Sequence, residues 1–331
     1  MVQDRLSGSQ TRSDTRTGGS RLSHALDLRS HPLDSGFAPL PSNERAIALV
    51  QGFVDGIERC ALLRGPSGWG KSHLLSNAAI ALAARYGRRI EPISVLAWVR
   101  SPVKPEDPTP LILDDFAEIL GSLRFRHELR HRLERRKKAG RATLVAQTSE
   151  SGPLLNAHFG NGWVTGMIQS PSAEERTLIV QEMAIREGMT LNPAVSRLIA
   201  RRIHGNGRSI LGALRRLHLD GANWASADSA CRAGGVLMPY FLGDDGWDPR
   251  DQALEAVQSV VGDRPEASAL CAFCLLDVMG HSEDETAAFL NMPAPKVYQL
   301  KQTIAKADEQ SEEARLAKAC RRAVIESFVK L

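Results

Sequence analysis

Short apolar runs alternate with amphipathic stretches through the middle of the chain, between residues 46 and 219. Four runs have the length and composition of buried strands: 60–65, 93–99, 110–116 and 142–149. The stretches 73–87 and 123–140 repeat apolar residues at helical spacing, and each ends in a glycine. Strands that alternate with helices are typical of a parallel sheet with crossover helices. We therefore expect an α/β core over residues 36–170.

The pattern becomes purely helical beyond the last predicted strand. Residues 174–224 predict three helices, which would form a small all-α lid over residues 171–225. A stretch dense in glycine and aspartate follows, and it predicts a linker over residues 226–250. Residues 251–331 predict a final all-α domain.

The composition is that of an ordinary soluble protein, with 43% hydrophobic and 24% charged residues. No apolar run approaches the ~20 residues that cross a bilayer, so we expect no membrane partner. Residues 1–35 contain few large apolar residues and predict a flexible tail without a secretory signal. These features favour a cytoplasmic location. The net charge of +4 permits an anionic partner without requiring one.

The five cysteines predict free thiols. Their number is odd, and a reducing cytosol disfavours disulfides. Cys271 and Cys274 form a C-x-x-C pair within an apolar run, but no second pair stands at zinc-ligand spacing. We expect both thiols to be buried by packing, and metal binding is the weaker alternative.

The segment between the first strand and the next helix indicates phosphate chemistry. It satisfies the P-loop pattern G-x-x-x-x-G-K-[ST] with Gly65, Pro66, Ser67, Gly68, Trp69, Gly70, Lys71 and Ser72. Its glycines let backbone N–H groups point at phosphates, and the helix N-terminus adds partial positive charge. We expect Lys71 to reach the β- and γ-phosphates of ATP and Ser72 to ligate Mg²⁺.

Two aspartates follow the strand predicted at 110–116. Asp114 and Asp115 stand at its carboxyl end, the edge where ligands bind in open α/β sheets. We expect Asp114 to hold Mg²⁺ through water and Asp115 to polarise the attacking water as a catalytic residue. An acidic turn after a buried strand is the alternative.

Two further positions are candidates for sensing the γ-phosphate. Thr148 or Ser149, at the end of the strand beside the P-loop strand, is one candidate. An ordinary residue that caps this strand is the alternative. Arg208 opens the last lid helix, from which it would reach the phosphates. An ordinary surface arginine is the alternative.

These motifs, in this order, resemble the AAA+ module of the DnaA family of bacterial replication initiators, over roughly residues 37–331. Residues 65–75 look like that family's Walker A motif with its trailing His-Leu-Leu. The resemblance adds His73 to the nucleotide site and implies that Asn43 lies near the adenine. The run 206–214 looks like the family's sensor-2 pattern, whose arginine falls on Arg208. The implied fold is an AAA+ P-loop core with an all-α lid, and the implied cofactors are ATP and Mg²⁺.

The last domain resembles the C-terminal DNA-binding domain of DnaA, which is built on a helix-turn-helix. Residues 281–304 read independently as helix, turn and helix. A helical bundle without DNA contact is the alternative. The candidate DNA contacts are Arg264, Lys296, Gln299 and Lys301.

Two departures from the family pattern change the expected activity. The family's polar base-reading run is replaced by Met292, Pro293, Ala294 and Pro295, which offer no side-chain hydrogen bonds to base edges. The family's arginine finger falls on His158, and a neutral histidine stabilises transition-state charge less than a guanidinium. We therefore expect a nucleotide switch with at most slow ATP hydrolysis, and weak sequence recognition.

Basic residues crowd the helix predicted at 123–140 and the turn after it. They offer a phosphate-binding surface, and a solvated helix face is an equal alternative. The nine are Arg124, Arg126, Arg130, Arg132, Arg135, Arg136, Lys137, Lys138 and Arg141.

The combined interpretation is a DnaA-like ATP-binding protein of the bacterial cytoplasm or nucleoid. It would act in initiation of DNA replication or its regulation, through an ATP-dependent conformational or assembly switch. Its partners would be DNA, through phosphate contacts, and a second copy or another AAA+ protein such as DnaA. The alternatives are a regulatory homologue that docks on another AAA+ protein, a loader of a replicative helicase or transposase, and an ATP-binding transcription factor.

Overall fold

A single parallel sheet forms the centre of the N-terminal half. The computed structural model describes residues 37–116, 119, 121–149, 159, 162–226, 228–241, 247–308 and 310–329. Within them the five strands pair in the order β2-β3-β4-β1-β5, all parallel. The strands are β1 (Cys60–Gly65), β2 (Ile93–Ser94), β3 (Leu111–Asp114), β4 (Thr143–Thr148) and β5 (Val164–Met167). The predicted parallel α/β core is confirmed.

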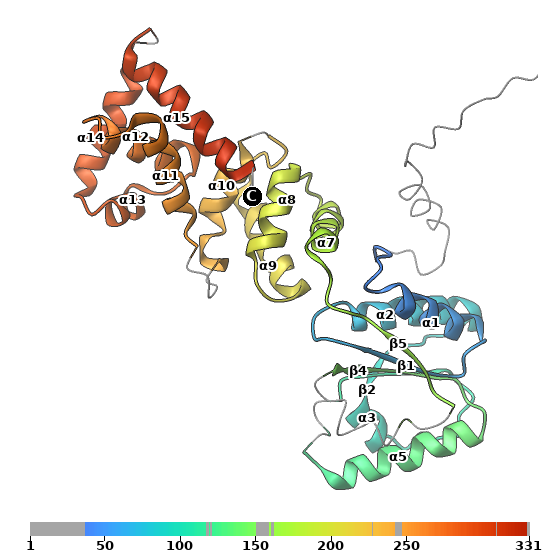
Figure 1. The fold of residues 1–331 in the computed structure, drawn as a ribbon. Helices are drawn as coiled ribbons and strands as arrows, with labels where there is room; N and C mark the ends of the chain where they lie inside the picture. The colour runs from blue at the N-terminus through green and yellow to red at the C-terminus, as the bar shows by residue number, and fades with distance from the viewer. Residues whose placement is uncertain are drawn as a thin grey trace, which may run out of the picture.

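Helices cover both faces of this sheet (Figure 1). One face packs on α1 (Glu44–Asp55) and α2 (Lys71–Tyr86), and the other on α3 (Val95–Arg100) and α5 (Leu123–Lys138). Alternate strand residues join opposite clusters, so that Ile112 faces α2 and Leu113 faces α5. By the same alternation Asp114 lies on the α2 face, which carries the P-loop.

The strand predicted at 93–99 is wrong beyond Ser94. The Ser94 side chain accepts a hydrogen bond from the Ala97 N–H and starts α3, which buries Trp98. A short apolar run fits a buried helix as well as a strand, because periodicity alone does not separate them. The edge strand β5 was not predicted, since only one of its four residues is buried.

Three helices follow the core, as predicted for the lid: α7 (Ala173–Arg186), α8 (Pro193–Arg202) and α9 (Gly207–Asp220). Each begins with a side-chain cap. Ser172 and Glu175 form a capping box on α7, and Asn192 and Asn206 cap α8 and α9. These caps fix where each lid helix starts relative to the core.

The stretch expected as a linker contains the buried helix α10 (Ser229–Val236) and the turn η4 (Met238–Tyr240). Gly234 and Gly235 are helical, and they permit close contact: a Cβ on Gly235 would stand 2.4 Å from the Met279 carbonyl oxygen. The prediction of an open linker through these residues is therefore wrong. Residues 242–246 lie outside the described part of the chain.

The remaining elements are α11 (Pro249–Val261), α12 (Ala267–Phe273), the π-helix η5 (Cys274–Val278), α13 (Glu283–Phe289), α14 (Ala294–Ala305) and α15 (Glu312–Val329). Most of their buried apolar side chains belong to the same hydrophobic cluster as those of the lid, which runs from Val180 to Phe328, and a smaller cluster is formed by Ala272, Leu276, Ala287 and Val297. The lid and the C-terminal helices thus share one core. They form the helical lobe beside the α/β core in Figure 1.

All five cysteines are free, as predicted, and all five are buried, which was predicted for Cys271 and Cys274. Burial raises the pKa of the Cys231 thiol to about 12 and that of Cys271 to about 11. Among the described residues no group of three His, Cys, Asp or Glu side chains is placed to hold a metal ion. The described helices also include none long and apolar enough to cross a bilayer.

Candidate nucleotide site

The P-loop turns from β1 into α2 through two glycines in left-handed conformation. Gly68 has φ +76° and Gly70 has φ +91°, a region that glycine enters without strain. A Cβ on Gly68 would lie 2.2 Å from Asn206 Cγ, and one on Gly70 would lie 2.3 Å from the Phe37 ring. Both positions therefore need glycine for conformation and for space.

Lys71 is folded back into the P-loop. Its Nζ donates to the carbonyl oxygens of Gly65 at 2.9 Å and Pro66 at 2.7 Å, and only 7% of the residue is exposed. The ammonium therefore lies within the turn. It has to exchange these carbonyls for phosphate oxygens if it is to bind a nucleotide.

Two oxygen ligands converge at the mouth of the P-loop. The Ser72 hydroxyl donates to Asp114 Oδ2 at 2.5 Å, and Asp114 Oδ1 accepts the Asp115 N–H at 2.9 Å. A hydroxyl and a carboxylate are hard oxygen donors that suit Mg²⁺, so the pair fits this ion. Asp115 has φ +58°, an uncommon conformation for a residue other than glycine. Such strain is concentrated at functional sites in proteins.

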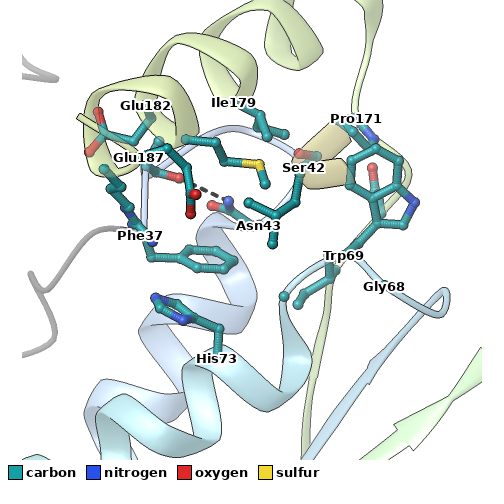
Figure 2. A pocket seen from close by; sticks show the side chains of 17 residues that line it. Phe37, Ser42, Asn43, Gly68, Trp69, His73, Pro171, Ile179, Glu182 and Glu187 are labelled. Atoms are coloured by element: carbon teal, nitrogen blue, oxygen red, sulfur yellow. Dashed lines mark hydrogen bonds between the residues drawn. The ribbon is translucent and has the colours of Figure 1, made fainter. Parts of the chain in front are cut away.

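A cavity of about 310 Å³ lies between the P-loop, the segment before α1, and the lid. Its walls are mostly apolar: Phe37 stacks on His73 with ring centroids 5.7 Å apart, and Ile179 and Met183 face it from α7. Figure 2 shows Phe37 and His73 at one side and Trp69 near Pro171 at the other. An apolar cavity of this size, beside a phosphate-binding loop, suits a flat aromatic base.

Asn43 lines this cavity, but its side chain shapes the backbone around it. Its Oδ1 accepts the Leu40 N–H at 2.9 Å, and its Nδ2 donates to the Ala38 carbonyl at 2.9 Å. The residue is 5% exposed. Asn43 therefore holds the segment that carries Phe37, and direct contact with an adenine remains a prediction.

The sensor candidates lie at the two sides of the P-loop. Thr148 ends β4 and is paired in register with Gly65 of β1. Ser149 follows it and is exposed. Across the loop, Arg208 is exposed in the first turn of α9, and its N–H binds the capping Asn206 Oδ1 at 2.9 Å. Asn206 packs on Gly68 of the P-loop, and Arg208 follows Asn206 by two residues in the sequence.

Two of the four DNA-binding candidates are already ion-paired. Arg264 binds Glu312 at 2.7 Å, and Lys301 binds Asp277 at 3.1 Å. Lys296 and Gln299 are exposed on α14. The sequence pattern did not show these pairings, because each joins residues at least two dozen positions apart.

The basic helix is partly structural. Arg136 is 2% exposed and Arg132 is half-buried, and both donate to carbonyls of the 98–109 segment. Arg135 pairs with Glu106. Arg132 and Arg136 are therefore wrong as parts of a phosphate-binding surface, whereas Arg135 is exposed. Arg124, Arg130 and Lys138 are exposed on the same helix.

Some predicted positions fall outside the described residues, and some contacts were missed. His158, the arginine-finger position, and the tail at 1–35 are not described.

The contacts that the sequence did not reveal are the stack of Phe37 on His73 and the Arg176 guanidinium over the Trp69 ring at 5.3 Å. No local signal identifies them, since each pairs side chains from separate elements.

Comparison with known proteins agrees with this architecture. No family model matches the chain. It is 25% identical over 253 residues to the chromosomal replication initiator protein DnaA of Caulobacter sp. (strain K31), a match that covers 68% of this chain and 52% of that protein. The chain therefore spans about half the length of this curated relative.

Solved structures of DnaA share the fold. Domain III of the Thermotoga maritima replication initiation protein DnaA matches with a TM-score of 0.52 and 20% identity, over 63% of this chain and 96% of that one. AMPPCP-bound DnaA from Aquifex aeolicus matches with a TM-score of 0.50 and 17% identity, over 92% of this chain and 98% of that one. The chain is thus similar in sequence to DnaA over 68% of its length, and its sheet and helices share the fold of domain III of DnaA.

Proposed function

We propose that this chain is a DnaA-like ATP-binding protein that acts in initiation of DNA replication or in its regulation. The observation that carries the proposal is the set of contacts made by the P-loop. Gly68 and Gly70 line the apolar cavity, Ser72 binds Asp114, and Gly68 packs on Asn206 of the lid. The similar Aquifex protein binds AMPPCP, an ATP analogue, which supports the same ligand class here.

In this proposal the nucleotide replaces contacts that the protein now makes with itself. Lys71 leaves the Gly65 and Pro66 carbonyls for the β- and γ-phosphates, and the P-loop N–H groups bind the remaining oxygens. Ser72 and Asp114 hold Mg²⁺, which neutralises phosphate charge when it is bound. Arg208 approaches from the lid. ATP binding thereby favours one arrangement of lid and core.

Hydrolysis is a separate step of the proposal. Asp115 follows Asp114 at the edge of the sheet, where its carboxylate would orient a water toward the γ-phosphate. A histidine at position 158, in place of an arginine finger, removes a guanidinium that would stabilise the transition state. We therefore expect slow hydrolysis, so that the ATP-bound state persists.

Titration with a fluorescent ATP analogue tests the nucleotide site. We expect Lys71→Ala to weaken binding by at least roughly tenfold, equivalent to about 1.4 kcal/mol, because a charge-assisted contact to phosphate is lost. The matched control is Lys138→Ala, which removes an exposed lysine from α5. Wild-type protein that does not bind the analogue, or equal affinities for Lys71→Ala and wild type, would contradict the proposal.

Charge distribution favours DNA contacts from the core over contacts from the last helices. Residues 249–331 hold ten Lys or Arg against thirteen Asp or Glu, whereas residues 37–170 hold eighteen against twelve. An acidic unit repels phosphates. The exposed Arg124 and Arg130 of α5 are therefore better candidates for a phosphate surface than the helix-turn-helix formed by α13 and α14.

The acidic excess of the last helices also supports a second candidate function, a regulator that docks on another AAA+ protein. Arg264 and Lys301 are ion-paired, Met292 and Pro293 precede α14, and Ala294 and Pro295 begin it, so the C-terminal helices offer few side chains for DNA. Sedimentation of this chain with purified DnaA separates the two. A stable complex together with feeble DNA binding would favour the regulator.

A further inference from the structure

Trp69 connects two of the hydrophobic clusters of the molecule. Its indole packs against the core cluster around α1 and α2, and also against the cluster shared by the lid and the C-terminal helices. It is a P-loop residue, directly before Gly70. A change in the P-loop backbone at this position therefore displaces a side chain that contacts the lid.

Arg176 of α7 holds the other side of this indole. Its guanidinium carbon stands 5.3 Å from the Trp69 ring centroid, within the range of a cation–π contact. The neighbouring Glu175 accepts the Ser42 N–H at 2.8 Å, so the start of α7 is fixed to the core as well. The guanidinium is half-buried, which strengthens its electrostatic contacts.

The same guanidinium organises the turn that leads to Arg208. Arg176 Nε donates to the Ala200 carbonyl at 2.8 Å, and its two terminal nitrogens donate to the carbonyls of Ile203 and Gly205. These three acceptors span the end of α8 and the turn before α9. One planar donor group therefore fixes both the Trp69 ring and this turn.

The turn before α9 also packs against the P-loop. The Asn206 side chain fills the space where a Cβ of Gly68 would lie, and a Cβ on Gly207 would stand 2.9 Å from the Gly68 carbonyl oxygen. Asn206 also caps α9 at the Arg208 N–H. A closed chain of contacts thus runs from Gly68 and Trp69 through Arg176 to Asn206 and back to Gly68.

We propose that Trp69 and Arg176 are positioning residues that couple the conformation of the P-loop to the placement of Arg208. The proposal rests on the proposed function, because the input is ATP binding. When phosphates reorganise the P-loop, the Trp69 ring moves with it, and Arg176 transmits the movement to residues 200–208. A ligand shifts such an equilibrium only through contacts that differ between the two states, and these contacts provide that difference.

A double-mutant cycle on the full chain tests the coupling. Dissociation constants for a fluorescent ATP analogue are measured for wild type, Arg208→Ala, Trp69→Leu and the double variant. We expect Arg208→Ala to weaken binding roughly tenfold in the wild-type background and by less than about twofold in the Trp69→Leu background. Trp69→Phe keeps an aromatic face and should restore most of the effect.

The control uses another lid arginine. Arg197 donates to the Val329 carbonyl in the C-terminal helices, away from the P-loop. Arg197→Ala should leave the effect of Arg208→Ala unchanged. If Trp69→Leu does not fold, Arg176→Lys replaces it in the cycle, because lysine keeps the charge and loses the fork to the three carbonyls.

The outcomes separate this inference from the function it rests on. Wild-type protein that binds the analogue, with effects of Trp69→Leu and Arg208→Ala that multiply, would overturn the coupling and leave the nucleotide site intact. Wild-type protein that does not bind the analogue would overturn both. Hydrogen exchange of residues 200–208 provides an independent readout: protection by ATP should disappear in Trp69→Leu, and unchanged protection would also overturn the coupling.

Discussion

Arg136 lies fully buried on α5, where five oxygen atoms surround its guanidinium. It donates to Thr143 Oγ1 and to four carbonyls, those of Pro105, Asp107, Thr109 and Ala142. Burial lowers the pKa of Arg136 to about 10, so the group stays charged at neutral pH. It fastens the loop that leads into β3, and so it supports the strand that presents Asp114.

Replacement of this guanidinium should destabilise the core. We expect Arg136→Met to lower the free energy of unfolding by about 3 kcal/mol, because several buried carbonyls lose their donor. Urea unfolding followed by circular dichroism measures the change. Arg130→Met, on the exposed side of the same helix, should alter stability by less than about 0.5 kcal/mol. Equal effects of the two variants would contradict this role.

At the scale of elements, the sequence predicted those helices and strands whose residues carry a clear local pattern. The P-loop was predictable because one motif specifies both a turn and its neighbouring strand and helix. The Asp114 strand was predictable because a short apolar run ends in two aspartates. The helix α3 and the strand β5 were not, since a short apolar run and an exposed edge give no clear period. The Trp69–Arg176 contact and the Arg264–Glu312 pair depend on packing between distant segments, which no window of sequence contains.

The packing of helix α10, which lies where a linker was predicted, can be tested directly. Gly235→Ala should lower the free energy of unfolding by about 2 kcal/mol, because the added methyl meets the Met279 carbonyl of the neighbouring turn. Thermal unfolding measures the shift. Gly121→Ala is the control, because no described atom stands within 4 Å of its Cβ position. A neutral Gly235→Ala would indicate that this segment is loosely packed.

The two candidate DNA surfaces are also distinguished at the scale of elements. We expect Arg124→Ala/Arg130→Ala on α5 to weaken binding to single-stranded DNA and to reduce the salt slope by roughly 1.4, the value for two lost phosphate contacts. Lys296→Ala/Gln299→Ala on α14 should change the slope less, because only one of these two side chains is charged and residues 249–331 hold more acidic than basic residues. The opposite ranking would assign the DNA surface to the helix-turn-helix.

At the scale of the whole molecule, one helical lobe combines the lid with the last helices. Because apolar side chains of the lid and of α11, α12 and α15 share the cluster from Val180 to Phe328, we expect a movement of the lid to carry these helices with it. In the proposed function, nucleotide binding at the P-loop would therefore reorient these C-terminal helices relative to the sheet. Removal of the last helices would expose the lid core, so point variants test their function more cleanly than truncation.

The proposed function implies that ATP controls binding of this chain to DNA. Fluorescence anisotropy of labelled single-stranded and double-stranded DNA tests it most directly, at two salt concentrations, with ATP, with ADP and without nucleotide. We predict binding that requires ATP and weakens steeply with salt, since the contacts are to phosphates. DNA binding that is feeble in every condition, or the same with ATP and ADP, would contradict the claim.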